Sequence, residues 1–96
     1  MYFILTYHFV DNYLKARSPY RAAHFEYLTP HITDGNLLLG GATAEPADKG
    51  ILIFKSESKE AVVAFAKSDP YVLQGIVATY DVQPWTVVAG ALHHTS

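Results

Sequence analysis

The chain lacks cysteine, a surplus of positive charge and any long apolar run. Each of these absences excludes certain classes of site or partner. Without cysteine there is no disulfide framework, no thiolate nucleophile and no thiolate metal ligand, and the cytoplasm is the expected location. Seven Lys and Arg against nine Asp and Glu give a net charge of −2, which argues against a nucleic-acid partner. The apolar opening stops at Asp11, too short to span a bilayer. We therefore expect neither nucleic acid nor a membrane as a partner.

Apolar and aromatic side chains, in contrast, are abundant. Half of the 96 residues are hydrophobic and 14% are aromatic. A chain this short forms one domain with a thin core, so residues 1–96 are predicted to be a single domain, with a core at 2–88 and a C-terminal tail at 89–96. A thin core does not hide this much apolar surface, so we expect part of it to face a second copy in a homodimer.

Hydrophobic patterns and capping residues predict four strands and two main helices. Strands are expected at residues 2–10, 36–43, 51–55 and 76–88, with a loop at 11–17. Gly40–Gly41 predicts a bulge or a close backbone approach, and Pro84 predicts an edge strand or a bulge. Helices are expected from Pro19, capped by Ser18, to Asp34–Gly35, and from Ser58 to Ser68, followed by a short turn at 71–74 that Asp69–Pro70 begins. Pro30 predicts a kink in the first helix or two short helices in its place.

This order of elements is that of an α+β fold of the ferredoxin-like type, the βαββαβ split βαβ sandwich. Four antiparallel strands then form one sheet, and both main helices cover one of its faces. The strand patterns leave the other face apolar, so we expect it to be buried against the sheet of a second chain.

The same topology directs His24 and Asp69 toward one region between helix and sheet, because the two helices run antiparallel. A carboxylate bonded to one imidazole nitrogen raises the basicity of the other, as a general base requires near neutral pH. Arg21 lies one turn before His24, where it can hold a carboxylate or phenolate of a substrate. Three tyrosines are candidates to line this pocket: Tyr7, Tyr27 and Tyr71.

A purely structural role is the alternative for these residues. Asp69 then only caps the short helix, His24 is a satisfied core histidine and Arg21 is a solvated charge. No cofactor is expected either, since neither a phosphate-binding loop nor a dinucleotide fingerprint is present.

Five histidines are spread along the chain without the close spacing of metal ligands: His8, His24, His31, His93 and His94. No metal site is therefore predicted. A third functional possibility is a protein of this fold that uses heme or oxygen. It would need a histidine in an open cleft, and His31 is the one helical candidate besides His24.

Three short motifs resemble those of the YCII (YciI-like) family. Arg21–His24 matches the family's R-x-x-H at the start of the first helix, Ser68–Tyr71 matches its D-P-[YF] turn, and Val82–Trp85 resembles its V-x-P-[FW] ending. They stand in the family's order, with Gly40–Gly41 between them. The C-terminal tail lies outside the pattern, and Pro30 stands in a helix that members usually leave unbroken.

The resemblance implies a dimeric α+β barrel and a pocket with a His-Asp pair, carried here onto His24 and Asp69 with Arg21 beside them. One branch of the family acts as a dehydrochlorinase on chlorinated hydroxyquinols, and the fold is similar to that of muconolactone isomerases. The expected function is a cofactorless small-molecule lyase or isomerase with a His-Asp general base. The alternative is a non-catalytic small-molecule-binding or accessory module on the same dimeric scaffold.

Overall fold

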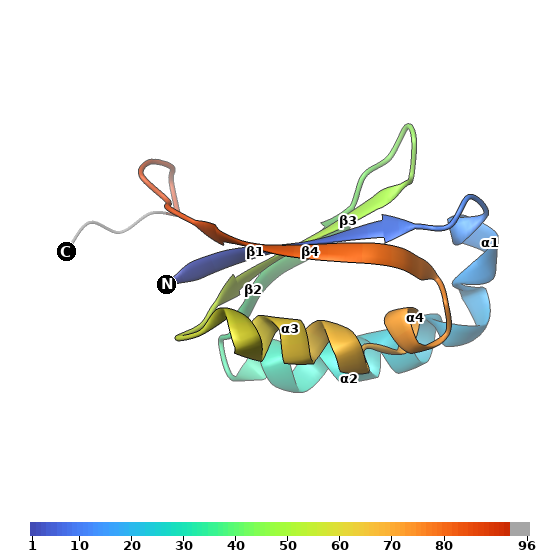
Figure 1. Ribbon diagram of the computed structural model, residues 1–96, viewed down its shortest axis with the longest axis horizontal. Helices are drawn as coiled ribbons and strands as arrows, with labels where there is room; N and C mark the ends of the chain where they lie inside the picture. Colours follow the sequence, from blue (N-terminus) through green and yellow to red (C-terminus); the bar gives the residue numbers. More distant parts are fainter. Residues whose placement is uncertain (93–96) are drawn as a thin grey trace.

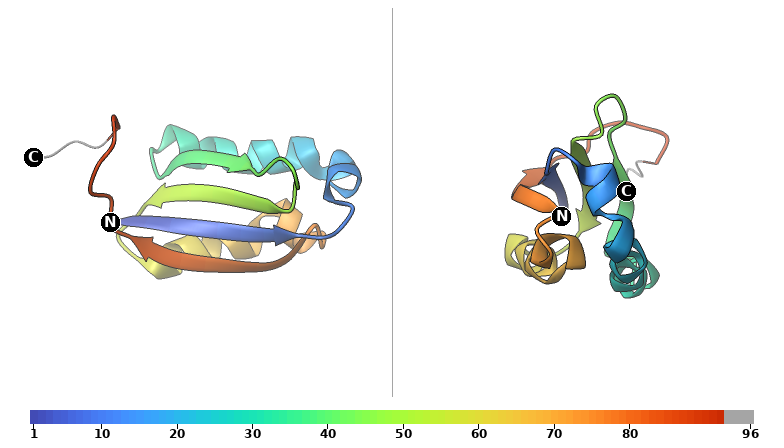
Figure 2. Two further views of the ribbon diagram at one scale, coloured as in Figure 1. Left: turned by 90° about the horizontal axis from the view of Figure 1, so that it is seen from above. Right: turned by 90° about the vertical axis from the view of Figure 1, so that its right-hand side faces the viewer.

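The computed structural model describes residues 1–92, and its sheet is built around strand β1 (Tyr2–Phe9). β1 pairs with β3 (Lys49–Lys55) on one side and with β4 (Val77–Trp85) on the other, while β2 (Leu37–Ala42) pairs with β3. All neighbours are antiparallel, and the order β2-β3-β1-β4 is visible in Figure 2, left. This is the predicted ferredoxin-like arrangement.

Alternation along the strands separates a core face from an open face. In β1, Phe3, Leu5 and Tyr7 are buried, and the residues between them are only half-buried. Leu52 and Phe54 on β3 lie opposite Leu5 and Phe3 and are buried with them, because cross-strand partners share a face. The hydrophobic core therefore lies between this face and the helices.

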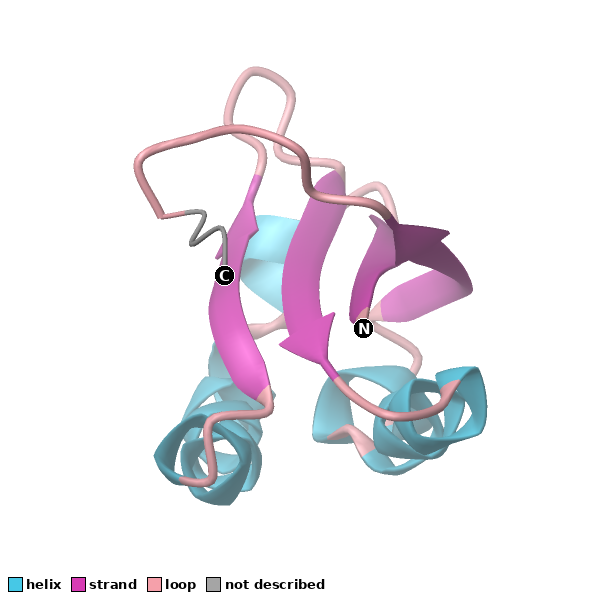
Figure 3. Ribbon diagram, turned by 90° about the vertical axis from the view of Figure 1, so that its left-hand side faces the viewer, coloured by secondary structure: helices cyan, strands magenta, loops and turns pink. Residues whose placement is uncertain are grey.

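The main helices cover one face of the sheet, as predicted (Figure 1; Figure 3). Helix α2 (Arg21–Thr33) and helix α3 (Lys59–Ser68) run antiparallel, and the short α4 (Pro70–Leu73) follows α3. Helix α1 (Tyr13–Ala16) lies beyond the end of β1. Within residues 1–92 no helix is long and apolar enough to cross a membrane.

The predicted caps of α3 and α4 are confirmed. The Ser58 hydroxyl accepts a hydrogen bond from the Ala61 amide at 3.2 Å, and the Asp69 carboxylate accepts one from the Tyr71 amide at 2.9 Å. Each satisfies an amide that the first helical turn leaves without a backbone partner. Gly75, with a φ of 76°, adopts the left-handed backbone conformation directly after α4 and leads the chain into β4.

The segment before α2 was predicted wrongly. Residues 11–17 were expected to be a loop, but α1 occupies much of this segment, and a 3₁₀ turn at Ser18–Tyr20 leads into α2. Ser18 makes no side-chain cap, since the chain is already helical at that position. Such short turns are stabilised by tertiary packing and leave little periodic signal in a sequence.

The prediction of two short helices around Pro30 is also wrong, because α2 runs unbroken from Arg21 to Thr33. Pro30 lies in the last part of the helix, where its missing amide leaves the Glu26 carbonyl without that one helical bond. The Thr29 hydroxyl donates to the Phe25 carbonyl at 2.9 Å.

The expected bulge lies elsewhere in β2. The register shifts between Leu37 and Leu39, whereas Gly40 and Gly41 pair regularly with β3. Glycine permits a bulge without requiring one. Pro84 confirms the expected edge position, since β4 is an outer strand of the sheet.

Candidate active site

His24 and Asp69 meet between the helices, although 45 positions separate them in the chain. His24 lies in the first turn of α2, and Asp69 joins α3 to α4. The Nδ1 atom of His24 is 2.8 Å from Oδ1 of Asp69. Asp69 is the buried charged residue of the described chain, with no exposed side-chain surface, and the His24 side chain is 11% exposed. The predicted juxtaposition is therefore present in the structure.

Three donors surround the Asp69 carboxylate. His24 Nδ1 and the Tyr71 amide share Oδ1, and the Tyr7 hydroxyl donates to Oδ2 at 2.7 Å. A buried carboxylate is costly unless such bonds replace its lost hydration. Because a carboxylate only accepts, Nδ1 is the donor in this contact, and in the neutral imidazole Nε2 then carries the lone pair. Nε2 is thus the nitrogen available to a substrate.

An aromatic ring fixes the plane of the imidazole. The rings of His24 and Tyr71 are stacked, with centroids 3.8 Å apart and an interplanar angle of 5°. His24 is consequently held both at Nδ1 and on one face.

Burial and charge act on the nearby phenols. Burial, reinforced by the negative charge of Asp69, raises the pKa of the Tyr7 hydroxyl above its ordinary range, so this hydroxyl stays a donor. Burial and then Asp69 also raise the pKa of Tyr27. Burial raises the pKa of Tyr71, while the positive charges of Arg21 and Arg17 oppose that rise.

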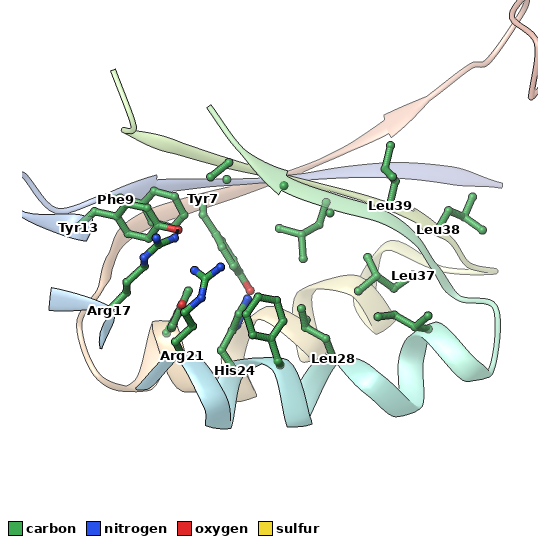
Figure 4. Close-up of a pocket in the computed structure, with 18 residues that line it drawn as sticks. Tyr7, Phe9, Tyr13, Arg17, Arg21, His24, Leu28, Leu37, Leu38 and Leu39 are labelled. Atoms are coloured by element: carbon green, nitrogen blue, oxygen red, sulfur yellow. Dashed lines mark hydrogen bonds between the residues drawn. The ribbon is translucent and has the colours of Figure 1, made fainter. Parts of the chain in front are cut away.

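A cavity of about 490 Å³ opens beside His24 (Figure 4). Arg17 and Arg21 line it, and no acidic side chain does. Its other walls are largely aliphatic or aromatic and come from α1, α2, α4, β1, β2 and β3. This volume lies within the range of small-molecule sites, which combine apolar walls with a few polar groups.

A model described as the YCII-related domain matches residues 1–86. The chain belongs to this family. The match includes His24, Asp69 and all four strands of the sheet, since β4 ends at Trp85. It confirms the resemblance that the sequence motifs indicated. No curated protein matches the chain.

One solved structure shares this fold over nearly its whole length. It is the 5-chloro-2-hydroxyhydroquinone dehydrochlorinase of Burkholderia phenoliruptrix, in complex with 2,5-dihydroxybenzoquinone. The TM-score is 0.77 at 26% identity, and the alignment covers 90% of this chain and 94% of that protein. A small-molecule enzyme is therefore among the structures that the YCII domain resembles.

Three of the four residues predicted to line the pocket do lie at the cavity beside His24, and one does not. Arg21, Tyr7 and Tyr71 lie at the cavity with His24. Tyr27 does not share it: its hydroxyl donates to the Phe65 carbonyl at 2.7 Å, and its ring lines another groove. Along a helix, a residue three positions on is turned about 60° away from the first, which carries Tyr27 from His24 toward α3.

Sequence reasoning missed Arg17 and Tyr13, both of which line the cavity. Arg17, Arg21 and His24 stand at the i, i+4 and i+7 spacing that places side chains on one side of a continuous helix. This signal was hidden because residues 11–17 were assigned to a loop.

The other histidines lie apart from His24. His31 lines the groove that contains Tyr27, and His8 contacts Asp81 at 3.0 Å on the open face of the sheet. His93 and His94 lie outside the described residues. Across residues 1–92, no three His, Cys, Asp or Glu side chains are grouped as metal ligands.

Proposed function

We propose that this YCII-family chain is a cofactorless lyase or isomerase in which His24 moves a proton on a small molecule. The observation that carries the proposal is the contact between His24 and the buried Asp69 at the wall of a cavity. An oriented imidazole with one free nitrogen is the usual general base at neutral pH. The likeness to a dehydrochlorinase supports an elimination as the reaction type.

In the proposed reaction, Nε2 of His24 takes a proton from an O–H or C–H bond of the substrate. The electron pair of that bond moves into the carbon framework. On an aromatic substrate the proton is first returned to the ring carbon that bears the leaving group, which gives a keto tautomer, and loss of a second O–H proton then forms a new C=O and C=C bond and expels the leaving group, such as chloride, with its own electron pair. In an isomerisation, His24 returns the proton at another carbon. Asp69 orients the imidazole and stabilises the imidazolium, and Arg21 stabilises negative charge on the substrate.

The tyrosines have different roles in this proposal. Tyr7 was expected to bind substrate, but its hydroxyl is bonded to Asp69, so we assign it to positioning the carboxylate. Tyr71 holds the imidazole by stacking. Tyr27 packs between α2 and α3 and takes no part in binding.

We also propose that the working unit is a homodimer joined through the open sheet face. Ile4, Ile51 and Ile53 are only half-buried there, and Leu39, opposite Ile53, is 65% exposed. A second sheet would remove this apolar surface from water.

Replacing His24 tests the function directly. Chlorinated hydroxyquinols, including 5-chloro-2-hydroxyhydroquinone, the compound in the neighbour's name, serve as candidate substrates, and chloride release is followed with time. The native chain should release chloride, and His24→Gln should lower kcat by about a hundredfold or more. His31→Gln, on the same helix but outside the cavity, is the matched control and should keep its activity.

Two results would contradict the enzyme proposal. Turnover by His24→Gln at the native rate would remove the proton-transfer role. Tight binding of these compounds by the native chain, with no chemical change in any of them, would favour the non-catalytic binding module.

A further inference from the structure

The cavity beside His24 has two unlike ends. Figure 4 shows Arg17 and Arg21 at the end formed by Phe9 and Tyr13, while Leu28 and Leu37 line the opposite end. His24 lies between them. Each end of the cavity favours a matching chemical group of a ligand. The cationic end favours a negative charge, and the apolar end favours a hydrophobic group.

Both guanidinium groups are held by aromatic side chains. Arg17 Nη1 donates to the Tyr13 hydroxyl at 3.1 Å, and its guanidinium carbon lies 5.1 Å from the centre of the same ring. The guanidinium carbon of Arg21 lies 4.9 Å from the centre of the Phe25 ring. These contacts orient the cations and leave most of their N–H donors unused.

Neither arginine has an acidic partner in the described chain. The ion pairs of residues 1–92 join His8 to Asp81, His24 to Asp69, and Lys49 to Asp48. Two unpaired guanidinium groups at one end of a cavity without carboxylates favour an anionic group of a ligand.

A buried hydroxyl at the same cavity lacks a partner. Tyr71 is 2% exposed, and its hydroxyl proton has no acceptor among the described residues; the Arg21 guanidinium lies near enough to act on the oxygen but can only donate. Buried hydroxyls are almost always bonded, so an orphan one needs an explanation. Its ring lies 6.3 Å from the ring of Tyr13, centre to centre, which places it near the cationic end. An anionic oxygen there would accept its hydrogen bond.

The apolar end is kept open by a glycine. Gly40 pairs with the buried Leu52 and therefore faces the helices. A Cβ at Gly40 would meet only the Leu52 side chain, at 3.7 Å, so a larger side chain would extend into the cavity. Gly41 pairs with the half-buried Ile51 and has nothing within 4 Å of a Cβ, although it lines the rim of the same cavity. The position of the first glycine thus leaves room for the body of a ligand.

We propose that the ligand is an amphipathic anion. A carboxylate or comparable anionic oxygen group binds Arg17, Arg21 and Tyr71, and an apolar body passes His24 and extends over Gly40 toward the leucines. This inference rests on the proposed function only in placing the ligand beside His24, and it specifies the class of molecule that the site takes.

Calorimetric binding of three probes to the native chain tests both ends of the cavity. The probes are para-butylbenzoate, benzoate and para-butylbenzamide. The first should bind at least about tenfold more tightly than benzoate, which lacks the alkyl group, and than the amide, which lacks the charge. An amide that binds as tightly as the acid would overturn the proposal, as would an absence of any benefit from the butyl group or of any binding by the acid.

Variants locate each end. Arg17→Gln should weaken para-butylbenzoate about tenfold and leave para-butylbenzamide unchanged, whereas Lys15→Gln, the loss of a positive charge on α1 outside the cavity, should change neither. Tyr71→Phe should weaken the acid severalfold. Equal losses for acid and amide in Arg17→Gln would contradict a charge-specific contact.

A substitution elsewhere in the sheet supplies the control. Gly40→Val should remove most of the advantage of para-butylbenzoate over benzoate, and Ala78→Val, on β4 and outside the cavity, should retain it. If both variants behave like the native chain, the apolar body does not pass over Gly40 and that part of the proposal is wrong.

These measurements separate the ligand class from the reaction. Binding does not need turnover and is repeated in His24→Gln, which should still prefer the acid. Anion binding without any turnover would contradict the proposed function alone. A native chain that turns over an uncharged substrate in preference to its anionic counterpart would contradict the anion proposal alone.

Discussion

At the scale of single residues, the hydroxyl of Tyr7 links the sheet to the site. Tyr7 lies in the second half of β1 and is 1% exposed, and its hydroxyl donates to the carboxylate that holds His24. A rigid strand therefore positions a group that lies between two helices. Such support matters because small displacements of a catalytic base lower the rate steeply.

Replacing Tyr7 by phenylalanine has an expected dependence on pH. The pKa of the folded-state phenol is raised from its ordinary 10.0, first by burial and then by Asp69. Above about pH 10 the unfolded chain loses this proton and the folded chain keeps it, so the free energy of unfolding falls as pH rises, by up to about 1.4 kcal/mol per pH unit for one such group. Tyr7→Phe should show a shallower fall in urea titrations between pH 9 and 11, measured against the native chain.

At neutral pH, Tyr7→Phe should be less stable than the native chain. There it loses a buried hydrogen bond to a charged acceptor, so the free energy of unfolding should drop by about 1–3 kcal/mol. Identical alkaline slopes for Tyr7→Phe and the native chain would show that the phenol ionises alike in both states, and the assigned environment of Tyr7 would be wrong.

At the scale of elements, Asp69 has two structural contacts with separable consequences. It accepts from the Tyr71 amide as the N-cap of α4 and from His24 as the partner of the imidazole. Asparagine is an equally good N-cap but carries no charge. The substitution Asp69→Asn therefore preserves the helix start while weakening the support of an imidazolium.

We expect Asp69→Asn to lower kcat by about a hundredfold or more with a smaller effect on folding than Asp69→Ala, which also removes the cap. Ser58→Ala removes only the cap of α3 and should lower the free energy of unfolding by about 1 kcal/mol without changing kcat. Steady-state kinetics and denaturant titrations of the three variants measure both effects. Equal losses of activity in Asp69→Asn and Ser58→Ala would reduce the role of Asp69 to helix capping.

The helix starts at Ser58 and Asp69 were predictable because each cap is a local contact that one or two residues encode. Strand order and the meeting of His24 with Asp69 followed from the topology that the element order implied. The sequence did not predict which groove the Tyr27 side chain lines, since this depends on the rotation of α2 about its own axis. Arg17 was missed because α1, four residues long, is stabilised by packing of the buried Tyr13 more than by local pattern.

At the scale of the whole molecule, the sheet is unequal on its two faces. Helices cover one face, and Figure 2, left, shows the other without any element across its strands. Ile53 lies near the middle of this open face, opposite Ile4 on β1 and Leu39 on β2. Apolar neighbours at these positions give a second sheet a continuous surface to pack against.

The proposed dimer predicts that a charge at the centre of this face separates the subunits. Ile53→Asp would bury an unpaired carboxylate between two sheets, and its dimer dissociation constant should rise at least about thirtyfold in sedimentation equilibrium. In a monomer the same side chain reaches water, so circular dichroism should still show the folded chain. Leu73→Asp provides the control, because Leu73 is 65% exposed on α4 and lies on the helical side of the sheet. A native chain that sediments as a monomer, or a dimer that Leu73→Asp disrupts and Ile53→Asp does not, would place the contact elsewhere than on the open face.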